Sequence, residues 1–93
     1  MEVGIGKRSA ADVRKIRNSR VWRDRIRPDQ LRRFPYCQKC DKKGILKEAV
    51  EVDHIIPLEQ GGEPLDSKNL QSLCKRCHIL KSSDEARKRQ RIS

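Results

Sequence analysis

The stretch Val52–His78 reads VDHIIPL, then a polar loop, then NLQSLCKRCH, and it decides how this chain folds. It contains the cysteine pair Cys74 and Cys77, spaced as Cys-x-x-Cys. It also contains both histidines of the protein, together with Asp53 and Asn69. Two kinds of site are therefore interleaved here: a pair of thiols, and a group of polar side chains suited to metal binding or proton transfer.

A second Cys-x-x-Cys pair lies upstream of the first and completes a set of four thiols. Each two-residue spacer lets one tight turn present both sulfurs to the same ion, and four thiolates fill the tetrahedral coordination of zinc. We therefore expect a structural zinc site without an open coordination position, held by Cys37, Cys40, Cys74 and Cys77. Two disulfides, or unpaired and redox-active thiols, are the alternatives. No signal-peptide pattern is visible, so we expect a cytoplasmic protein, and a reducing cytoplasm favours metal binding.

The composition limits how much core the chain can build. Of its 93 residues, 34% are hydrophobic and 39% are charged, with a single Trp, Phe and Tyr. Hydrophobic burial alone would leave such a domain marginally stable, so a metal or disulfides are expected to stabilise it. No apolar run approaches the ~20 residues that span a bilayer, so we expect no membrane association.

The net charge of +10 is unevenly distributed. Residues 1–33 hold 11 Lys and Arg against 4 acidic residues, and residues 67–93 hold 8 against 2. Residues 34–66 hold 4 against 7, so two basic flanks enclose a slightly acidic centre. Basic flanks suit a polyanion such as nucleic acid, and a local acidic excess suits a divalent cation. Solvated helix faces that bind nothing specific would produce the same charge pattern.

The sequence before the cysteines predicts two helices. Residues 1–8 show no periodicity and are expected to form a loose tail. Ser9–Asp12 resembles a capping box, so we expect a short helix from about residue 10 to 16. In the next segment, the four-residue spacing of apolar side chains predicts a basic helix that packs Trp22 onto the domain. Pro28 interrupts this pattern, and we expect a kink or break there.

The sequence after the first cysteine pair predicts two strands and a helix. Residues 45–58 are β-like, with Ala49–Val52 as the strongest strand, and Asn69–Leu73 is expected to form a short second strand or an extended segment. A helix is expected from Lys75 toward Arg91. The chain then divides into a basic N-terminal tail with a short helix (residues 1–18), a basic helical segment (19–36), a zinc-braced domain (37–83) and a basic C-terminal helix end (84–93).

The complete pattern is Asp-His-x14-Asn-x4-Cys-x-x-Cys-His, with a Cys-x-x-Cys upstream. Together with VDHIIPL, NLQSLC and Cys-His-x-x-Lys, it resembles the HNH endonuclease family, in the cysteine-bearing branch common in bacteria and phages. The resemblance covers roughly two thirds of the chain and places the three letters on His54, Asn69 and His78. It implies an α+β fold: a small, treble-clef-like ββα-metal domain braced by the four-cysteine zinc site and preceded by N-terminal helices.

The resemblance also implies a chemistry, the hydrolysis of DNA phosphodiester bonds to 5′-phosphate and 3′-hydroxyl ends. His54 would be the general base that deprotonates the attacking water, and an unperturbed imidazole with a pKa near ~6.5 suits that task. Asp53 and His78 would ligate one catalytic divalent cation, and Asn69 would hydrogen-bond the backbone across the loop and hold His54 in place. A carboxylate with an imidazole accepts Mg²⁺, Mn²⁺, Ni²⁺ or Zn²⁺, so the sequence does not choose among them.

DNA is the expected partner, and phosphate contacts carry no sequence information, so we expect weak sequence preference. A zinc-braced DNA-binding module without catalysis is the alternative. A role beside phage packaging or other DNA-processing proteins is a third reading. The candidates for phosphate contacts are basic residues on both sides of the site: Arg20, Arg23, Arg27, Arg32, Arg33, Lys75, Arg76 and Lys81.

Overall fold

The computed structural model describes residues 7–92, with side chains as far as residue 87. The expected α+β class is confirmed, because helices surround a two-stranded antiparallel sheet. The strands are β1 (Glu51–His54) and β2 (Leu70–Leu73), and their register pairs the first residue of β1 with the last of β2. Among the described residues, no helix combines the length and apolar character needed to cross a membrane.

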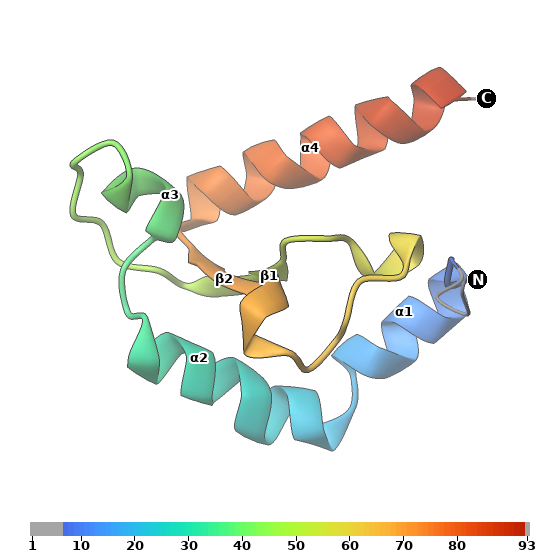
Figure 1. Ribbon diagram of the computed structural model, residues 1–93, viewed down its shortest axis with the longest axis horizontal. Helices are drawn as coiled ribbons and strands as arrows, with labels where there is room; N and C mark the ends of the chain where they lie inside the picture. The colour runs from blue at the N-terminus through green and yellow to red at the C-terminus, as the bar shows by residue number, and fades with distance from the viewer. Residues whose placement is uncertain (1–6, 93) are drawn as a thin grey trace.

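Two helices enclose this hairpin. Helix α2 (Arg27–Arg33) packs against one face, and α4 (Lys75–Ile92) crosses the other (Figure 1). A short helix, α3 (Gln38–Asp41), carries the first cysteine pair beside the start of α4. The connection between the strands contains two short 3₁₀ helices, η2 (Leu58–Gln60) and η3 (Ser67–Asn69). The two cysteine pairs therefore meet at one end of the hairpin.

Helix α1 (Ala10–Arg17) begins with the expected capping box. The Asp12 backbone N–H donates to Ser9 Oγ at 3.2 Å, and the Ser9 N–H donates back to the Asp12 carboxylate at 3.4 Å. The last residue of the predicted loose tail is not loose, because Arg8 is hydrogen-bonded to the loop after β1. Residues 1–6 of that tail lie outside the described residues.

Of the kink or break predicted at Pro28, the break is wrong, because the helix continues through this position. The π-helix η1 (Val21–Ile26) runs directly into α2, and both residues at the junction keep right-handed helical backbone angles. A proline ring clashes with the carbonyl four residues earlier and removes one N–H donor. Just ahead of Pro28 the Arg27 N–H donates to the Trp22 carbonyl, five residues back, and this wider turn absorbs the conflict. The arginine-rich helix is therefore continuous.

The first strand begins two residues later than predicted. The segment before it is held elsewhere, because the Ala49 N–H donates to the Pro35 carbonyl at 2.8 Å and Glu48 bridges to Tyr36. Pairing with β2 then selects Glu51–His54 as the strand. The second strand, predicted over residues 69–73, starts one residue later. Both corrections arise from tertiary pairing, which local propensity does not contain.

Trp22 packs on the hairpin as predicted, in a small core with Val52 and Leu70. A buried polar network joins the elements beneath it. The Gln30 amide donates to Ser72 Oγ at 3.2 Å, and the Ser72 N–H donates to the Gln38 side-chain oxygen at 2.7 Å. Helix α2 is thereby tied to β2 and to the first cysteine pair. Buried polar groups paired in this way fix one arrangement of the elements.

Gly62 lies in the loop after β1, at a position with no room for a side chain. A Cβ there would lie 1.9 Å from the Ile56 carbonyl oxygen. We expect Gly62→Ala to lower the free energy of unfolding by roughly 3 kcal/mol, because backbone atoms must move. Gly44→Ala is the matched control, since Gly44 has open space and a positive φ of 79°, which costs about 1 kcal/mol. Urea unfolding compares the two, and equal losses would contradict this reading.

Candidate functional site

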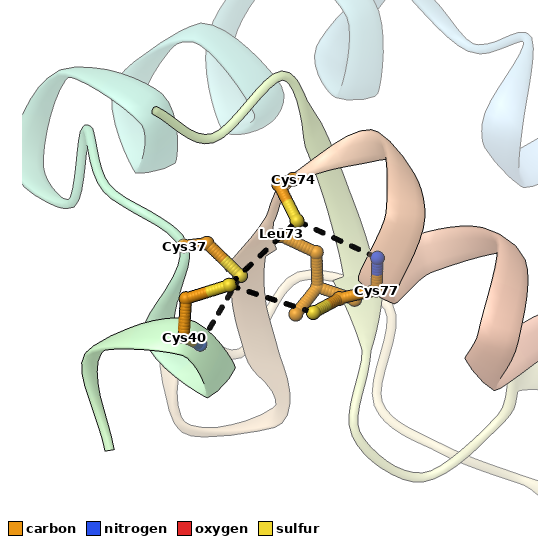
Figure 2. Close-up of a cluster of buried hydrophobic side chains, with 5 residues drawn as sticks. All are labelled: Cys37, Cys40, Leu73, Cys74 and Cys77. Atoms are coloured by element: carbon orange, nitrogen blue, oxygen red, sulfur yellow. Dashed lines mark hydrogen bonds between the residues drawn. The ribbon is translucent and has the colours of Figure 1, made fainter. Parts of the chain in front are cut away.

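The four cysteines form one buried cluster between α3 and α4 (Figure 2). Their sulfur atoms all lie within 4.8 Å of one another, and all four are free thiols. Each pair begins a helical turn: the Cys40 N–H points at Cys37 Sγ at 3.4 Å, and the Cys77 N–H at Cys74 Sγ at 3.5 Å. Leu73 packs beneath the sulfurs. The cluster could hold a metal ion, and the four thiols are suitable ligands for zinc.

The thiols differ in how readily they ionise. Burial raises the pKa of Cys37, but hydrogen bonds from the backbone of Cys74 and Cys40 outweigh this and lower it to about 6. Burial and the neighbouring sulfurs raise the pKa of Cys77 to about 12. Four thiolates this close repel one another, so a bound cation is needed to keep all of them ionised. This is the behaviour expected of a metal site that forms with the fold.

Asp53 lies in β1 with 4% of its surface exposed. Basic groups from two helices surround its carboxylate. Its carboxylate is 3.7 Å from the Arg17 guanidinium on α1. On the side of α4 it is 3.5 Å from Lys81 Nζ and 3.8 Å from His78 Nε2. The one hydrogen bond to its side chain among those that the structure describes comes from the His54 N–H, at 2.8 Å. A buried carboxylate with lone pairs left over is suited to a further cation.

His54 is fully buried and points to a different set of neighbours than Asp53, as expected for consecutive strand residues. Its ring stacks on Trp22 with centroids 4.8 Å apart and planes at 26°. Nε2 lies 3.0 Å from the Pro64 carbonyl oxygen. A carbonyl only accepts, so Nε2 carries the hydrogen and the lone pair is on Nδ1. Nδ1 is buried and has no hydrogen-bond partner among the described residues.

The expectation of an unperturbed His54 is corrected by this burial. Removal of the ring from water lowers its pKa below 6.5, although the hydrogen bond to Pro64 opposes the shift. Imidazolium loses more than neutral imidazole when it leaves water, so the neutral ring is favoured. His54 is therefore neutral at pH 7, with its lone pair available.

Asn69 closes the loop that joins the strands. Its side-chain oxygen accepts from the Ile56 N–H at 2.8 Å. Its amide donates to the Ile56 carbonyl at 3.2 Å and to the Glu63 carbonyl at 3.0 Å. These bonds hold the loop at Ile56 and at Glu63, the residue before Pro64, whose carbonyl contacts His54. The loop backbone is thus held by one buried side chain.

The eight basic residues predicted to contact phosphate fall into two groups. Four of them are occupied by other protein groups: Arg27 bonds to the Val50 carbonyl, Arg32 and Arg33 pair with Asp29, and Lys81 lies between Asp53 and Glu85. The Lys81 side chain is only 10% exposed, so it faces the site rather than open solvent. The other four are exposed: Arg20, Arg23, Lys75 and Arg76. DNA contact by any of the eight stays a prediction.

Three contributors to the site were missed from the sequence. Arg17 reaches Asp53 from α1, Arg8 bonds to the loop, and Pro64 contributes only its backbone carbonyl. Arg8 and Arg17 are two among many basic residues of the N-terminal segment, with nothing local to single them out. Every residue has a backbone carbonyl, so nothing in the sequence singles out that of Pro64.

A hairpin followed by a helix, with a carboxylate and two imidazoles at its centre, defines a ββα-metal domain, here of a type with four clustered cysteines. The HNH endonuclease family model matches residues 37–84, and the chain belongs to the HNH endonuclease family. It is therefore a nuclease, and its family implies DNA as the substrate.

A solved structure supports the same assignment. It is the crystal structure of the deep-sea thermophilic bacteriophage GVE2 HNH endonuclease with manganese ion. That protein is 39% identical to this chain, with a TM-score of 0.73, and the match covers 84% of this chain and 86% of that chain. No curated protein matches the sequence.

Proposed function

We propose that this nuclease hydrolyses DNA phosphodiester bonds with His54 as the general base and with one divalent cation held by Asp53 and His78. The observation that carries the proposal is His54 Nδ1, which is buried and has no hydrogen-bond partner among the described residues. Trp22 orients the ring, and the Pro64 carbonyl fixes the hydrogen on Nε2, so Nδ1 is the atom that can accept a proton. A base fixed in position and neutral at pH 7 is what water activation requires.

His54 acts as the proton acceptor in this proposal. Nδ1 accepts a proton from water as the water oxygen attacks phosphorus and the P–O3′ bond breaks. The departing 3′ oxygen takes a proton from solvent, and the imidazolium that forms keeps its Nε2–H bond to Pro64. Burial and the positive charges of Arg17 and Lys81 lower the pKa of His54, whereas the Pro64 hydrogen bond and the neighbouring Asp53 carboxylate favour the imidazolium. Because Nδ1 is buried, water reaches it only after neighbouring side chains move.

Asp53 and His78 suit a divalent cation. The Asp53 oxygen and His78 Nε2 are 3.8 Å apart, and one oxygen with one imidazole leaves coordination positions for phosphate and water. Bound there, the cation would supply positive charge to the phosphate oxygens as negative charge builds in the transition state. These two ligands accept Mg²⁺, Mn²⁺, Ni²⁺ or Zn²⁺. The similar phage structure was solved with manganese, which makes Mn²⁺ the first ion to test.

We also propose that zinc occupies the four-cysteine cluster and has no part in the chemistry. Four sulfurs within 4.8 Å support a closed tetrahedral site. Its function is to join α3 to the start of α4, and His78 directly follows Cys77 in that helix. A reducing cytoplasm, our proposed location for the protein, keeps such thiols available.

Binding to DNA would depend on the exposed basic side chains at the start of η1 and α4. They include Arg20, Arg23, Lys75 and Arg76, which form no ion pair among the described residues. Phosphate contacts of this kind give weak sequence preference and affinity that falls steeply with salt. Family membership favours an enzyme over the alternative of a DNA-binding module without catalysis.

Cleavage of supercoiled plasmid tests the proposal. We expect the wild type to nick plasmid with Mn²⁺ or Mg²⁺ and to stop when the divalent cation is chelated. Asp53→Asn removes the carboxylate at nearly constant volume and should lower the rate by about 10²-fold or more, because cation binding weakens. Titration calorimetry with Mn²⁺ measures that binding separately.

Glu48→Gln is the matched control, since it makes the same chemical change at an exposed position of the acidic centre. It should cleave and bind Mn²⁺ like the wild type. A wild type that binds DNA without nicking it under any divalent cation would refute the nuclease mechanism. Wild-type Mn²⁺ affinity in folded Asp53→Asn would refute only the assignment of the ligand.

A further inference from the structure

The N-terminal segment is attached to the loop between the strands through Arg8. Its backbone N–H donates to the Glu59 carbonyl at 3.1 Å. Its guanidinium Nη1 donates to the Leu58 carbonyl at 3.1 Å and to the Gly62 carbonyl at 2.7 Å. Arg8 lies outside residues 37–84, the part of the chain that the family model matches. These three bonds therefore join the N-terminal segment to the part of the chain that the family model matches.

The place where Arg8 attaches matters for His54. The same loop contains Pro64, whose carbonyl accepts from His54 Nε2 at 3.0 Å. Asn69 holds the loop from inside, at Ile56 and Glu63. Arg8 holds it at two carbonyls that Asn69 does not touch. The loop that carries the Pro64 carbonyl is thus held by both Arg8 and Asn69.

Helix α1 gives Arg8 a fixed origin. The capping box at Ser9 starts the helix at the very next residue, and α1 packs against η2 in that loop. Figure 1 shows α1 beside the connection that follows β1. At its other end, α1 brings Arg17 to within 3.7 Å of Asp53. A rotamer-rich arginine held at a helix start loses less freedom on forming these bonds than one in a loose tail.

We propose that Arg8 is a positioning residue for the general base. By fixing the loop at Leu58 and Gly62, it keeps the Pro64 carbonyl against His54 Nε2 and so keeps the lone pair on Nδ1. The inference rests on the proposed role of His54. Without the Arg8 bonds the loop loosens, the Pro64 carbonyl shifts, and part of the His54 population places its hydrogen on Nδ1, where it cannot accept a proton from water.

The test compares three variants in the full chain. Arg8→Ala removes the guanidinium and its bonds to the Leu58 and Gly62 carbonyls. Lys7→Ala removes the same charge from an exposed neighbour. Arg8→Lys keeps the charge and a donor for the two carbonyls. Plasmid nicking at saturating Mn²⁺ measures kcat and KM. Side-chain ¹⁵N shifts of His54, recorded on the zinc-loaded protein without added Mn²⁺, report which ring nitrogen carries the hydrogen, independently of activity.

We expect Arg8→Ala to lower kcat by about tenfold relative to Lys7→Ala, with KM for DNA within about twofold. Its His54 spectrum should change from the Nε2–H form to a mixture of both forms, and Arg8→Lys should recover part of both effects. Zinc content and far-UV circular dichroism establish that each variant is folded. If Arg8→Ala does not fold, kcat and the His54 spectrum are compared between Arg8→Lys and the wild type instead.

Two results would overturn the inference. One is a His54 spectrum in folded Arg8→Ala that matches Lys7→Ala. The other is a raised KM with unchanged kcat, which would make Arg8 a DNA contact. Failure of the proposed function looks different: the wild type itself would not cleave, while the ¹⁵N shifts would still show whether Arg8 controls the His54 ring.

Discussion

His54→Ala is expected to lower the rate of metal-dependent nicking by about 10³-fold, which is the usual contribution of a general base. The ring carries Nδ1, which is buried and has no hydrogen-bond partner among the described residues, so the substitution removes the atom that would accept the proton. Binding to DNA should change little, because the ring is fully buried and offers no surface to phosphate. Plasmid nicking and a filter-binding assay with uncleaved DNA measure the two effects separately.

A fold control is needed, because alanine also removes the stacking partner of Trp22 and leaves a cavity that costs about 2–4 kcal/mol. His54→Gln fills most of that space and keeps a donor for the Pro64 carbonyl, but an amide does not accept a proton at neutral pH. It should be more stable than His54→Ala and equally inactive. Nicking at the wild-type rate by folded His54→Gln would eliminate His54 as the base.

Cys77→Ser is expected to abolish binding of the proposed zinc and nearly all cleavage activity. Structural zinc contributes about 10–16 kcal/mol in zinc-finger peptides, which is comparable to the whole stability of a small domain. The next residue is His78, whose Nε2 lies 3.8 Å from the Asp53 carboxylate, so loss of the turn between Cys74 and Cys77 also displaces a proposed ligand. Zinc content, thermal unfolding and plasmid nicking give the three readouts.

Cys40→Ser separates loss of zinc from a direct effect of the Cys77 substitution on its neighbour His78. Cys40 is far from His78 in sequence, yet its sulfur lies 3.9 Å from that of Cys74 and 3.8 Å from that of Cys77. If zinc is the link, Cys40→Ser should fail in the same way as Cys77→Ser. Ser82→Ala, an exposed change on α4, should leave zinc and activity intact. Full activity in folded Cys77→Ser without zinc would refute the proposed dependence on the metal.

The parts of this structure that were predictable from the sequence depend on local spacing. Two residues between cysteines decide how a turn presents its sulfurs, and the exchange of bonds between Ser9 and Asp12 needs only four residues. The spacing of apolar residues around Trp22 likewise predicted its packing. Each of these features is decided within one turn of the chain.

The parts that were missed depend on contacts between distant segments. The start of β1 follows from pairing with β2, and the low pKa of His54 follows from burial under Trp22 and the loop. The continuity of the helix through Pro28 required a π-helical turn that no residue type announces. The role of Arg8 depends on hydrogen bonds from its guanidinium to loop carbonyls 50 and 54 residues away in the sequence.

The stacking of Trp22 on His54 has a practical consequence for anyone who studies this nuclease. Trp22 is the only tryptophan in the chain, so the indole emission of the protein comes from one ring, 4.8 Å from the proposed base. The chain therefore carries an intrinsic fluorophore stacked on the ring that would receive the proton, so a change in that stacking is expected to alter the emission without any label.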